Sequence, residues 1–99
     1  MPAYFVFHNR ILDTRKMEEY IPKAVETFAP YKAELVVLDE NSNVVEGETS
    51  LPRTVVIKFA SREAALAWYN SPEYQAALPL RLEATEGFAV LVDEFVFPG

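Results

Sequence analysis

The sequence predicts a small α+β domain in which helices cover one face of a four-stranded antiparallel sheet. Segments rich in branched and aromatic residues alternate with segments whose apolar residues recur at helical spacing. Along the chain the order is strand, helix, strand, strand, helix, strand, which is the split βαβ arrangement of ferredoxin-like domains. A chain of 99 residues has material for one core, so we expect residues 1–99 to form one domain.

The chain begins with a strand and an amphipathic helix. Residues 3–11 are rich in aromatic and branched side chains and have no helical period, which predicts a strand. Asp13-Thr14 then supplies a helix N-cap, and apolar side chains follow at three- and four-residue spacing as far as Phe28. Pro22 lies inside this pattern, so we expect the helix to kink or restart there, and Pro30 ends it.

The middle of the chain contains two further strands. Apolar residues at 35–38 and 44–45 flank the polar run 39–43. The pattern predicts either one strand with a polar break or a small hairpin over residues 33–48. After a loop, residues 54–60 form the third strand.

The second helical region is interrupted once. Ser61 caps a helix over residues 62–69, and Ser71-Pro72 then provides a new N-cap followed by proline at the first helical position. The second helical piece covers residues 73 to about 83, and residues 88–97 form the last strand.

Composition and charge exclude several classes of function. The chain has 9 Lys and Arg against 15 Asp and Glu, a net charge of −6, so it lacks the cationic surface that nucleic acid requires. No apolar run approaches the roughly 20 residues that span a bilayer. One histidine, no cysteine and three glycines offer neither metal-ligand spacing nor a phosphate loop, so we expect no metal and no cofactor. The lack of cysteine, and a start at Met1 that leads directly into a strand, favour a cytoplasmic location.

The strands also predict a partner. Residues 3–7, 55–57 and 88–92 are apolar on both faces, yet the helices can cover only one face of the sheet. A second copy that packs its own open face on this one would bury the rest and form a dimeric α+β barrel with a cavity between the sheets. The alternative is a monomer whose loops and C-terminal tail cover the second face.

Several motifs resemble one small protein family. They are Pro2-Ala3-Tyr4, Phe59-Ala60-Ser61, Glu63-Ala64-Ala65, Leu80-Arg81 and above all Trp68-Tyr69-Asn70-Ser71-Pro72-Glu73-Tyr74-Gln75. In these the chain resembles the domain of unknown function 1330 family, within the dimeric α+β barrel superfamily. The resemblance implies a fold, a dimer and a cleft, with no reaction attached. The chain departs from the family pattern where Lys32-Ala33 replaces a usual glycine pair, and where Lys58 replaces a usual acidic residue.

His8 and Lys58 are the candidate catalytic residues. Alternation puts His8 on the opposite face of its strand from Phe5 and Phe7. If the first and third strands are parallel neighbours, His8 and Lys58 point into the barrel cavity near the same end. A desolvated lysine beside an imidazole would serve as a base or a carboxylate anchor. Alternatively, His8 is a hydrogen-bonded residue at the cavity edge and Lys58 pairs with a carboxylate at the dimer interface.

Two arginines and two tyrosines are the candidate ligand-binding residues. Arg81 follows an apolar helix turn, where its donors would reach a ligand carboxylate or a neighbouring glutamate. Arg53 begins the third strand, and an ion pair with Glu46 is the alternative to a ligand contact. Tyr69 and Tyr74 bracket the break between the helices, so they would frame a pocket mouth or belong to the core.

Two classes of function remain open at this point. The first is a cofactor-independent enzyme, isomerase-like or monooxygenase-like, that acts on a small apolar or aromatic acid in the barrel cavity. Muconolactone isomerases and small quinone-forming monooxygenases share the expected fold, which is an analogy of architecture. The second is a non-catalytic dimer that binds a small apolar ligand or is purely structural.

Overall fold

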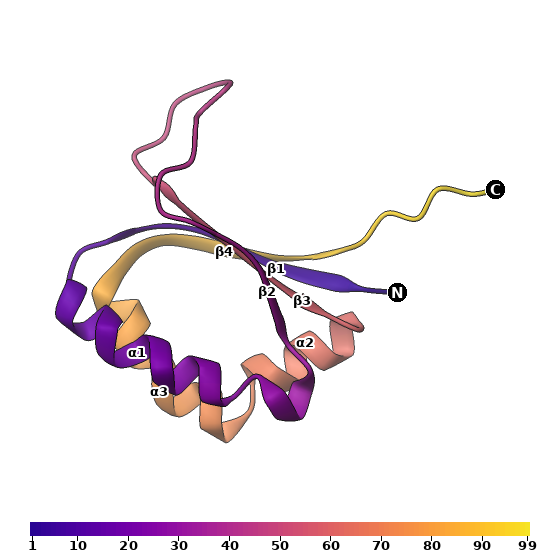
Figure 1. Ribbon diagram of the computed structural model, residues 1–99, viewed down its shortest axis with the longest axis horizontal. Coiled ribbons are helices and arrows are strands. Elements are labelled where there is room, and N and C mark those ends of the chain that lie inside the picture. Colours follow the sequence, from indigo (N-terminus) through magenta and orange to yellow (C-terminus); the bar gives the residue numbers. More distant parts are fainter.

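Helices and strands follow one another in the predicted α+β order. The computed structural model describes residues 1–99. Its elements are β1 (Ala3–Ile11), α1 (Thr14–Glu26), the short 3-10 helix η1 (Ala29–Tyr31), β2 (Glu34–Asp39), β3 (Arg53–Phe59), α2 (Arg62–Tyr69), α3 (Pro72–Ala84) and β4 (Thr85–Asp93). The sheet forms one layer and all helices lie on the same side of it (Figure 1). The ferredoxin-like α+β architecture is therefore confirmed. None of the helices is both long and apolar enough to cross a membrane.

The four strands lie in the order β2-β3-β1-β4, and every neighbouring pair is antiparallel. Within the central pair, Ala3 lies opposite Phe59 and His8 opposite Thr54. The expectation that the first and third strands are parallel is therefore wrong. The crossover through α1 makes β2 parallel to β1, and β3 returns antiparallel to β2 through a loop, so β3 opposes both of its neighbours.

The predicted helix starts are confirmed by their caps. The side chains of Asp13, Ser61 and Ser71 each accept a hydrogen bond from a backbone N–H three residues later. Helix α1 continues through Pro22 and does not restart there. Asn70 and Ser71 separate α2 from α3, as the sequence predicts.

Two strands have different bounds from those expected. β2 ends at Asp39, and residues 40–52 form a loop that projects away from the helices (Figure 1). Residues 44–48 form no strand because no neighbouring strand is paired with them. β4 begins at Thr85 and ends at Asp93, since Asp93 lies opposite Ala3, the first residue of β1, and β1 offers no partner beyond that point.

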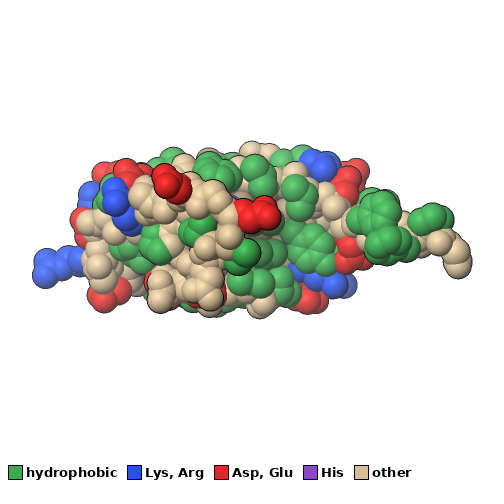
Figure 2. All heavy atoms as spheres, turned by 90° about the horizontal axis from the view of Figure 1, so that it is seen from above, with side chains coloured by type: hydrophobic (Ala, Val, Ile, Leu, Met, Phe, Trp, Pro, Cys, Tyr) green, Lys and Arg blue, Asp and Glu red, His purple; other side chains and the backbone are tan.

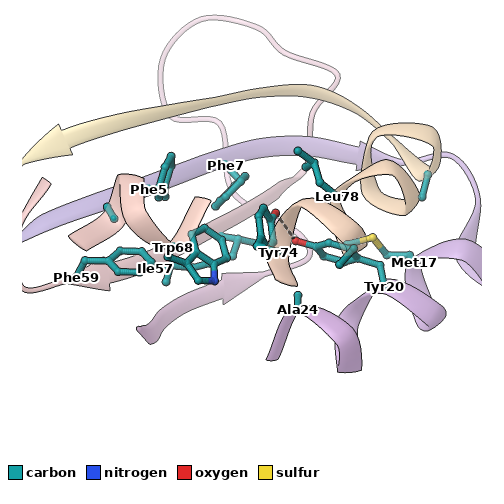
Figure 3. Packing of buried hydrophobic residues seen from close by; sticks show 14 residues of the cluster. Phe5, Phe7, Met17, Tyr20, Ala24, Ile57, Phe59, Trp68, Tyr74 and Leu78 are labelled. Atoms are coloured by element: carbon teal, nitrogen blue, oxygen red, sulfur yellow. Dashed lines mark hydrogen bonds between the residues drawn. The ribbon is translucent and has the colours of Figure 1, made fainter. Parts of the chain in front are cut away.

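The core lies between the sheet and the helices. Phe5, Phe7 and Phe59 point from the sheet toward Trp68 and Tyr74, whose side chains are completely buried (Figure 3). Trp68 is 4.0 Å from Tyr74 and 5.3 Å from Phe59 between ring centroids. The phenylalanine-bearing face of β1 thus meets the helices, as expected.

The other face of the sheet is largely apolar and has no helix over it. Phe88, Val90 and Val92 of β4 are 56%, 44% and 40% exposed, beside the half-buried Tyr4 and Val6 of β1. Hydrophobic side chains are spread along the side seen in Figure 2 and on the extended C-terminal tail. We call the side of the sheet opposite the helices, without the tail, the open sheet face. The C-terminal tail does not fold back over it but extends away from the body of the protein (Figure 1).

Gly87 occupies a position that only glycine fits. Its φ is +143°, and a Cβ built on it would lie 2.1 Å from the carbonyl oxygen of His8. We expect Gly87→Ala to lower the free energy of unfolding by about 1–3 kcal/mol from backbone strain, with the overlap adding to this. Each kcal/mol of this loss should lower Tm by roughly 4–8 °C, which thermal unfolding measures. Gly47→Ala is the control, because Gly47 also has a positive φ but has open space around it. Equal losses in the two variants would contradict the close approach of β4 to β1.

Candidate functional site

A cleft lies between α1 and the sheet, on the side that holds the core. Helix α1 packs mainly on α3 and makes few direct contacts with the strands, which leaves space beneath it. The cleft has a volume of about 70 Å³, and 11 of its 14 lining residues are hydrophobic. Such a concave, mainly apolar site with a few polar groups is typical of small-ligand binding.

Apolar side chains on both sides of the cleft are open to solvent. Ile21 and Val25 of α1 are 41% and 52% exposed, and Leu35 and Leu38 of β2 are 46% and 48% exposed. β2 is one of the two edge strands of the sheet, and no helix packs closely against the face that carries its two leucines. The four side chains therefore form an apolar mouth.

Arg81 of α3 brings a positive charge to the cleft. Its Nε donates to the hydroxyl of Tyr74 at 3.4 Å, and its Cζ lies 5.1 Å from the ring centroid of Phe7. No carboxylate forms a salt bridge with it. Burial by itself lowers the pKa of Arg81, but the nearby phenol oxygens of Tyr74 and Tyr20 outweigh this, and the pKa is raised. Arg81 is thus a permanent cation without an acidic partner.

Arg53 lies at the other polar point of the cleft and is 5% exposed. Its Nη1 donates to Oδ1 of the buried Asn9 at 3.5 Å, and its Nε lies 3.4 Å from a carboxylate oxygen of Glu40. The expected ion pair with Glu46 is therefore wrong. Glu40 directly follows β2, whose last residue, Asp39, pairs with Thr54, so Glu40 comes close to Arg53 while Glu46 lies farther out in the loop.

Neither Tyr74 nor Tyr69 lines the cleft, but Tyr74 contacts Arg81, which does. Tyr74 is completely buried, and its hydroxyl lies 2.7 Å from that of Tyr20 (Figure 3). Burial above all raises the pKa of Tyr20, with the neighbouring Tyr74 adding to the effect. Tyr69 packs at 5.5 Å from Phe5 between ring centroids, among the aromatic side chains of the core.

His8 and Lys58 lie on the open sheet face and are not close together. Since His8 pairs with Thr54 and Lys58 with Tyr4, they are four positions apart along β1, or about 13 Å. The expectation that they lie near the same end is wrong, because β1 and β3 are antiparallel. His8 Nδ1 lies 3.3 Å from Oγ1 of Thr54, and the imidazole ring packs beside Phe88.

Tyr20 and Asn9 also line the cleft, although neither was expected to be a site residue. Both lie within apolar patterns: Tyr20 on the buried face of α1, Asn9 on the helix-facing side of β1. A polar side chain on a buried face needs a hydrogen-bond partner, and that signal could have drawn attention to both.

A second hollow, of about 400 Å³, lies between the C-terminal half of α1 and the start of α3. Exposed charged side chains line it, including Lys23, Glu26 and Glu73. Its one buried hydroxyl, on Thr27, is already bonded to Ala24 and Trp68. The cleft is the better candidate because its polar side chains are buried or half-buried among apolar ones. No group of three His, Cys, Asp or Glu side chains comes together in the chain.

The buried phenol of Tyr20 generates a prediction about alkaline stability. Above about pH 10 the unfolded chain loses this proton while the folded protein keeps it. The free energy of unfolding therefore falls as pH rises, by up to about 1.4 kcal/mol per pH unit. Phenylalanine has no such proton, so we expect Tyr20→Phe to be less stable near neutrality but to lose less stability above pH 10. Urea unfolding across this range measures the difference, and parallel losses in the two proteins would contradict it.

Solved structures with this fold come from several bacteria. RPA0582 of Rhodopseudomonas palustris, a protein of unknown function, aligns over 96% of this chain and 83% of its own with 13% identity and a TM-score of 0.81. SnoaB of Streptomyces nogalater, a cofactor-independent oxygenase, aligns over 97% and 95% with 11% identity and a TM-score of 0.63. A dimeric ferredoxin-like protein of unknown function from Thermobifida fusca aligns over 92% and 89% with 19% identity and a TM-score of 0.59. At these identities the likeness establishes the fold alone.

Sequence comparison gives a family but no activity. No protein with a curated description matches the chain. The family model Domain of unknown function (DUF1330) matches residues 2–95, which is nearly the whole chain, and the protein therefore belongs to this family.

Proposed function

We propose that the protein is a homodimer in which the cleft of each subunit binds a small apolar or aromatic carboxylate. The observation that carries this proposal is Arg81, a half-buried guanidinium that borders an apolar cleft without a carboxylate partner. Arg53 adds a second cation, which is buried and whose ion-pair partner, Glu40, is 63% exposed. No acidic side chain lines the cleft.

Arg81 has N–H donors that no group of the protein uses and that a ligand could accept from. A guanidinium carries five N–H donors and no acceptor. Arg81 uses one of them, the Nε–H, on Tyr74. No buried side-chain nitrogen lacks a partner, so the remaining donors of Arg81 are open to water or to a ligand. A carboxylate matches the paired geometry of these donors.

The rest of the cleft suits an apolar body. The exposed side chains at its mouth, Ile21, Val25, Leu35 and Leu38, would be buried by a bound hydrocarbon or aromatic ring. Burial of apolar surface contributes roughly 25 cal/mol per Å². The volume of about 70 Å³ favours a small ligand that leaves part of its body at the mouth.

The cleft also limits which reaction it could support. No histidine, serine, cysteine or lysine lines it, so there is no nucleophile or imidazole base among its side chains. Arginine and phenol donors stabilise negative charge that develops on an oxygen. We therefore favour an isomerase-like or oxygenase-like reaction, in which negative charge develops on a substrate oxygen, over hydrolysis. Because no side chain of the cleft is a base, a proton released in such a reaction would pass to water or to the carboxylate of the substrate itself. A binding protein without turnover uses the same contacts.

A catalytic role for His8 and Lys58 stays a prediction. Both lie on the open sheet face, on the other side of the sheet from the cleft, so they would act in the cavity between two subunits. Separate replacement of each residue tests the role, since loss of turnover with unchanged ligand affinity would support it.

The open sheet face supports the dimer. Exposed branched and aromatic side chains on the strands of a small protein mark an interaction surface. A second copy of the same face is the self-complementary partner, and the dimeric ferredoxin-like proteins of T. fusca and Jannaschia provide precedents for this fold.

We expect Arg81→Gln to weaken the binding of phenylacetate, because the glutamine side chain carries no charge. The expected loss is about tenfold to a hundredfold, the usual range for a charge-assisted hydrogen bond. Isothermal titration calorimetry measures it. Arg15→Gln is the matched control, since Arg15 is an exposed residue of α1 that does not line the cleft. If wild-type protein binds phenylacetate no better than Arg81→Gln does, the proposed ligand class is wrong.

We expect Val90→Lys to convert the dimer to a monomer. Val90 lies in the middle of β4 on the open sheet face, so its replacement would place an unpaired charge inside the proposed interface. The dissociation constant should rise by about a hundredfold or more. Analytical ultracentrifugation measures it, with Leu66→Lys as control, because Leu66 is equally exposed at 43% but lies on a helix. A monomeric wild-type protein would contradict the proposal.

A further inference from the structure

Three polar groups form a chain that runs from α3 to α1. Arg81 Nε donates to the hydroxyl oxygen of Tyr74 at 3.4 Å, and this oxygen lies 2.7 Å from the hydroxyl oxygen of Tyr20. The two phenols point toward one another across the interface of the helices (Figure 3). Heavy-atom positions alone do not say which phenol donates to the other.

The arginine decides the direction of this chain. A guanidinium can only donate, so Tyr74 accepts from Arg81. Tyr74 is completely buried, and the only other group within hydrogen-bond distance of its hydroxyl is Tyr20. If Tyr20 also donated to Tyr74, the proton of Tyr74 would have no acceptor, which costs about 1–3 kcal/mol. Tyr74 therefore donates to Tyr20.

With this direction, the hydroxyl hydrogen of Tyr20 is not donated to any group of the protein. The oxygen of Tyr20 is occupied as an acceptor, and no other acceptor of the chain lies within hydrogen-bond distance of its hydroxyl. Tyr20 lines the cleft, whereas Tyr74 does not. Water or a ligand in the cleft is then the acceptor that the Tyr20 proton can reach.

We propose that the Tyr20 hydroxyl is a specificity-determining donor, held toward the cleft by the chain Arg81–Tyr74–Tyr20, and that it selects ligands whose oxygen accepts from it and from Arg81 together. The identity of the ligand rests on the proposed function, whereas the direction of the chain is a property of the unliganded protein. A phenol is protonated at neutral pH in any case, and burial raises the pKa of Tyr20 further, so the hydroxyl remains a donor.

The arrangement makes a chemical distinction between ligands. Arg81 and Tyr20 both present donors, so a carboxylate, which only accepts, satisfies both. A primary amide of the same shape has one acceptor oxygen and places an NH₂ group against a donor. The site should therefore prefer an arylacetic acid anion to its amide.

The direction of the chain can be tested without any ligand. Tyrosine labelled with ¹³C at Cζ gives two resolved signals in mixed H₂O and D₂O when its hydroxyl proton exchanges slowly, and one averaged signal when it exchanges fast. We expect the Tyr74 hydroxyl to exchange more slowly than that of Tyr20, because only the latter faces the cleft. Tyr20→Phe and Tyr74→Phe assign the signals. Equal or reversed exchange rates overturn the proposal.

The selectivity is tested with phenylacetate and phenylacetamide as probes. We expect Tyr20→Phe to weaken phenylacetate binding about tenfold and to reduce the preference for the acid over the amide. Tyr31→Phe is the control, because Tyr31 lies in η1 outside the cleft. If Arg81→Gln weakens binding but Tyr20→Phe does not, the role of Tyr20 is wrong while the proposed function stands. If wild-type protein binds neither probe, the proposed ligand class and the selectivity of Tyr20 both fail, and the exchange rates still decide the direction of the chain.

Discussion

The packing of Trp68 is the interaction on which the helical layer depends. This side chain is completely buried, and it contacts the phenylalanines of the sheet on one side and Phe28 and Tyr74 on the other. Its indole N–H donates to Oγ1 of Thr27 at 2.8 Å, directly after α1. The C-terminal end of α1 is thereby tied to the core, while the rest of the helix packs on α3. The cleft lies along α1 from Met17 to Val25 and reaches Phe28 beyond the end of the helix.

The charged side chains that line the cleft are positive, whereas the net charge of the whole chain is negative. The protein carries a net charge of −6, yet the only charged side chains that line the cleft are Arg53 and Arg81. The acidic residues are spread over the exposed surface, where water screens them, whereas the arginines are held among apolar groups that strengthen their field. A small anion that reaches the mouth therefore meets a locally positive site. Net charge excludes a nucleic-acid backbone but says little about a carboxylate.

Most of the fold could be predicted because its determinants are local. The caps Asp13, Ser61 and Ser71 and the alternating phenylalanines of β1 specify the elements and their buried faces from short stretches of sequence. The pairing partners of His8, Arg53 and Lys58 depend on strand direction, which is a property of the whole sheet. The expected parallel pairing of β1 and β3 placed Lys58 at the same end of the sheet as His8. The antiparallel pairing in the structure places it toward the other end.

The sequence by itself determined the order of the elements, the family resemblance and an apolar open sheet face. These features depend on hydrophobic periodicity and on turn residues, which are set by residues close together in the chain. It also indicated Arg53, Arg81 and Tyr74 as candidate ligand-binding residues. Only the tertiary structure decided that Arg81 meets Tyr74 and Tyr20 in one chain and that Arg53 pairs with Glu40. These contacts join residues from different elements, and their geometry depends on how α1 and α3 pack over the sheet.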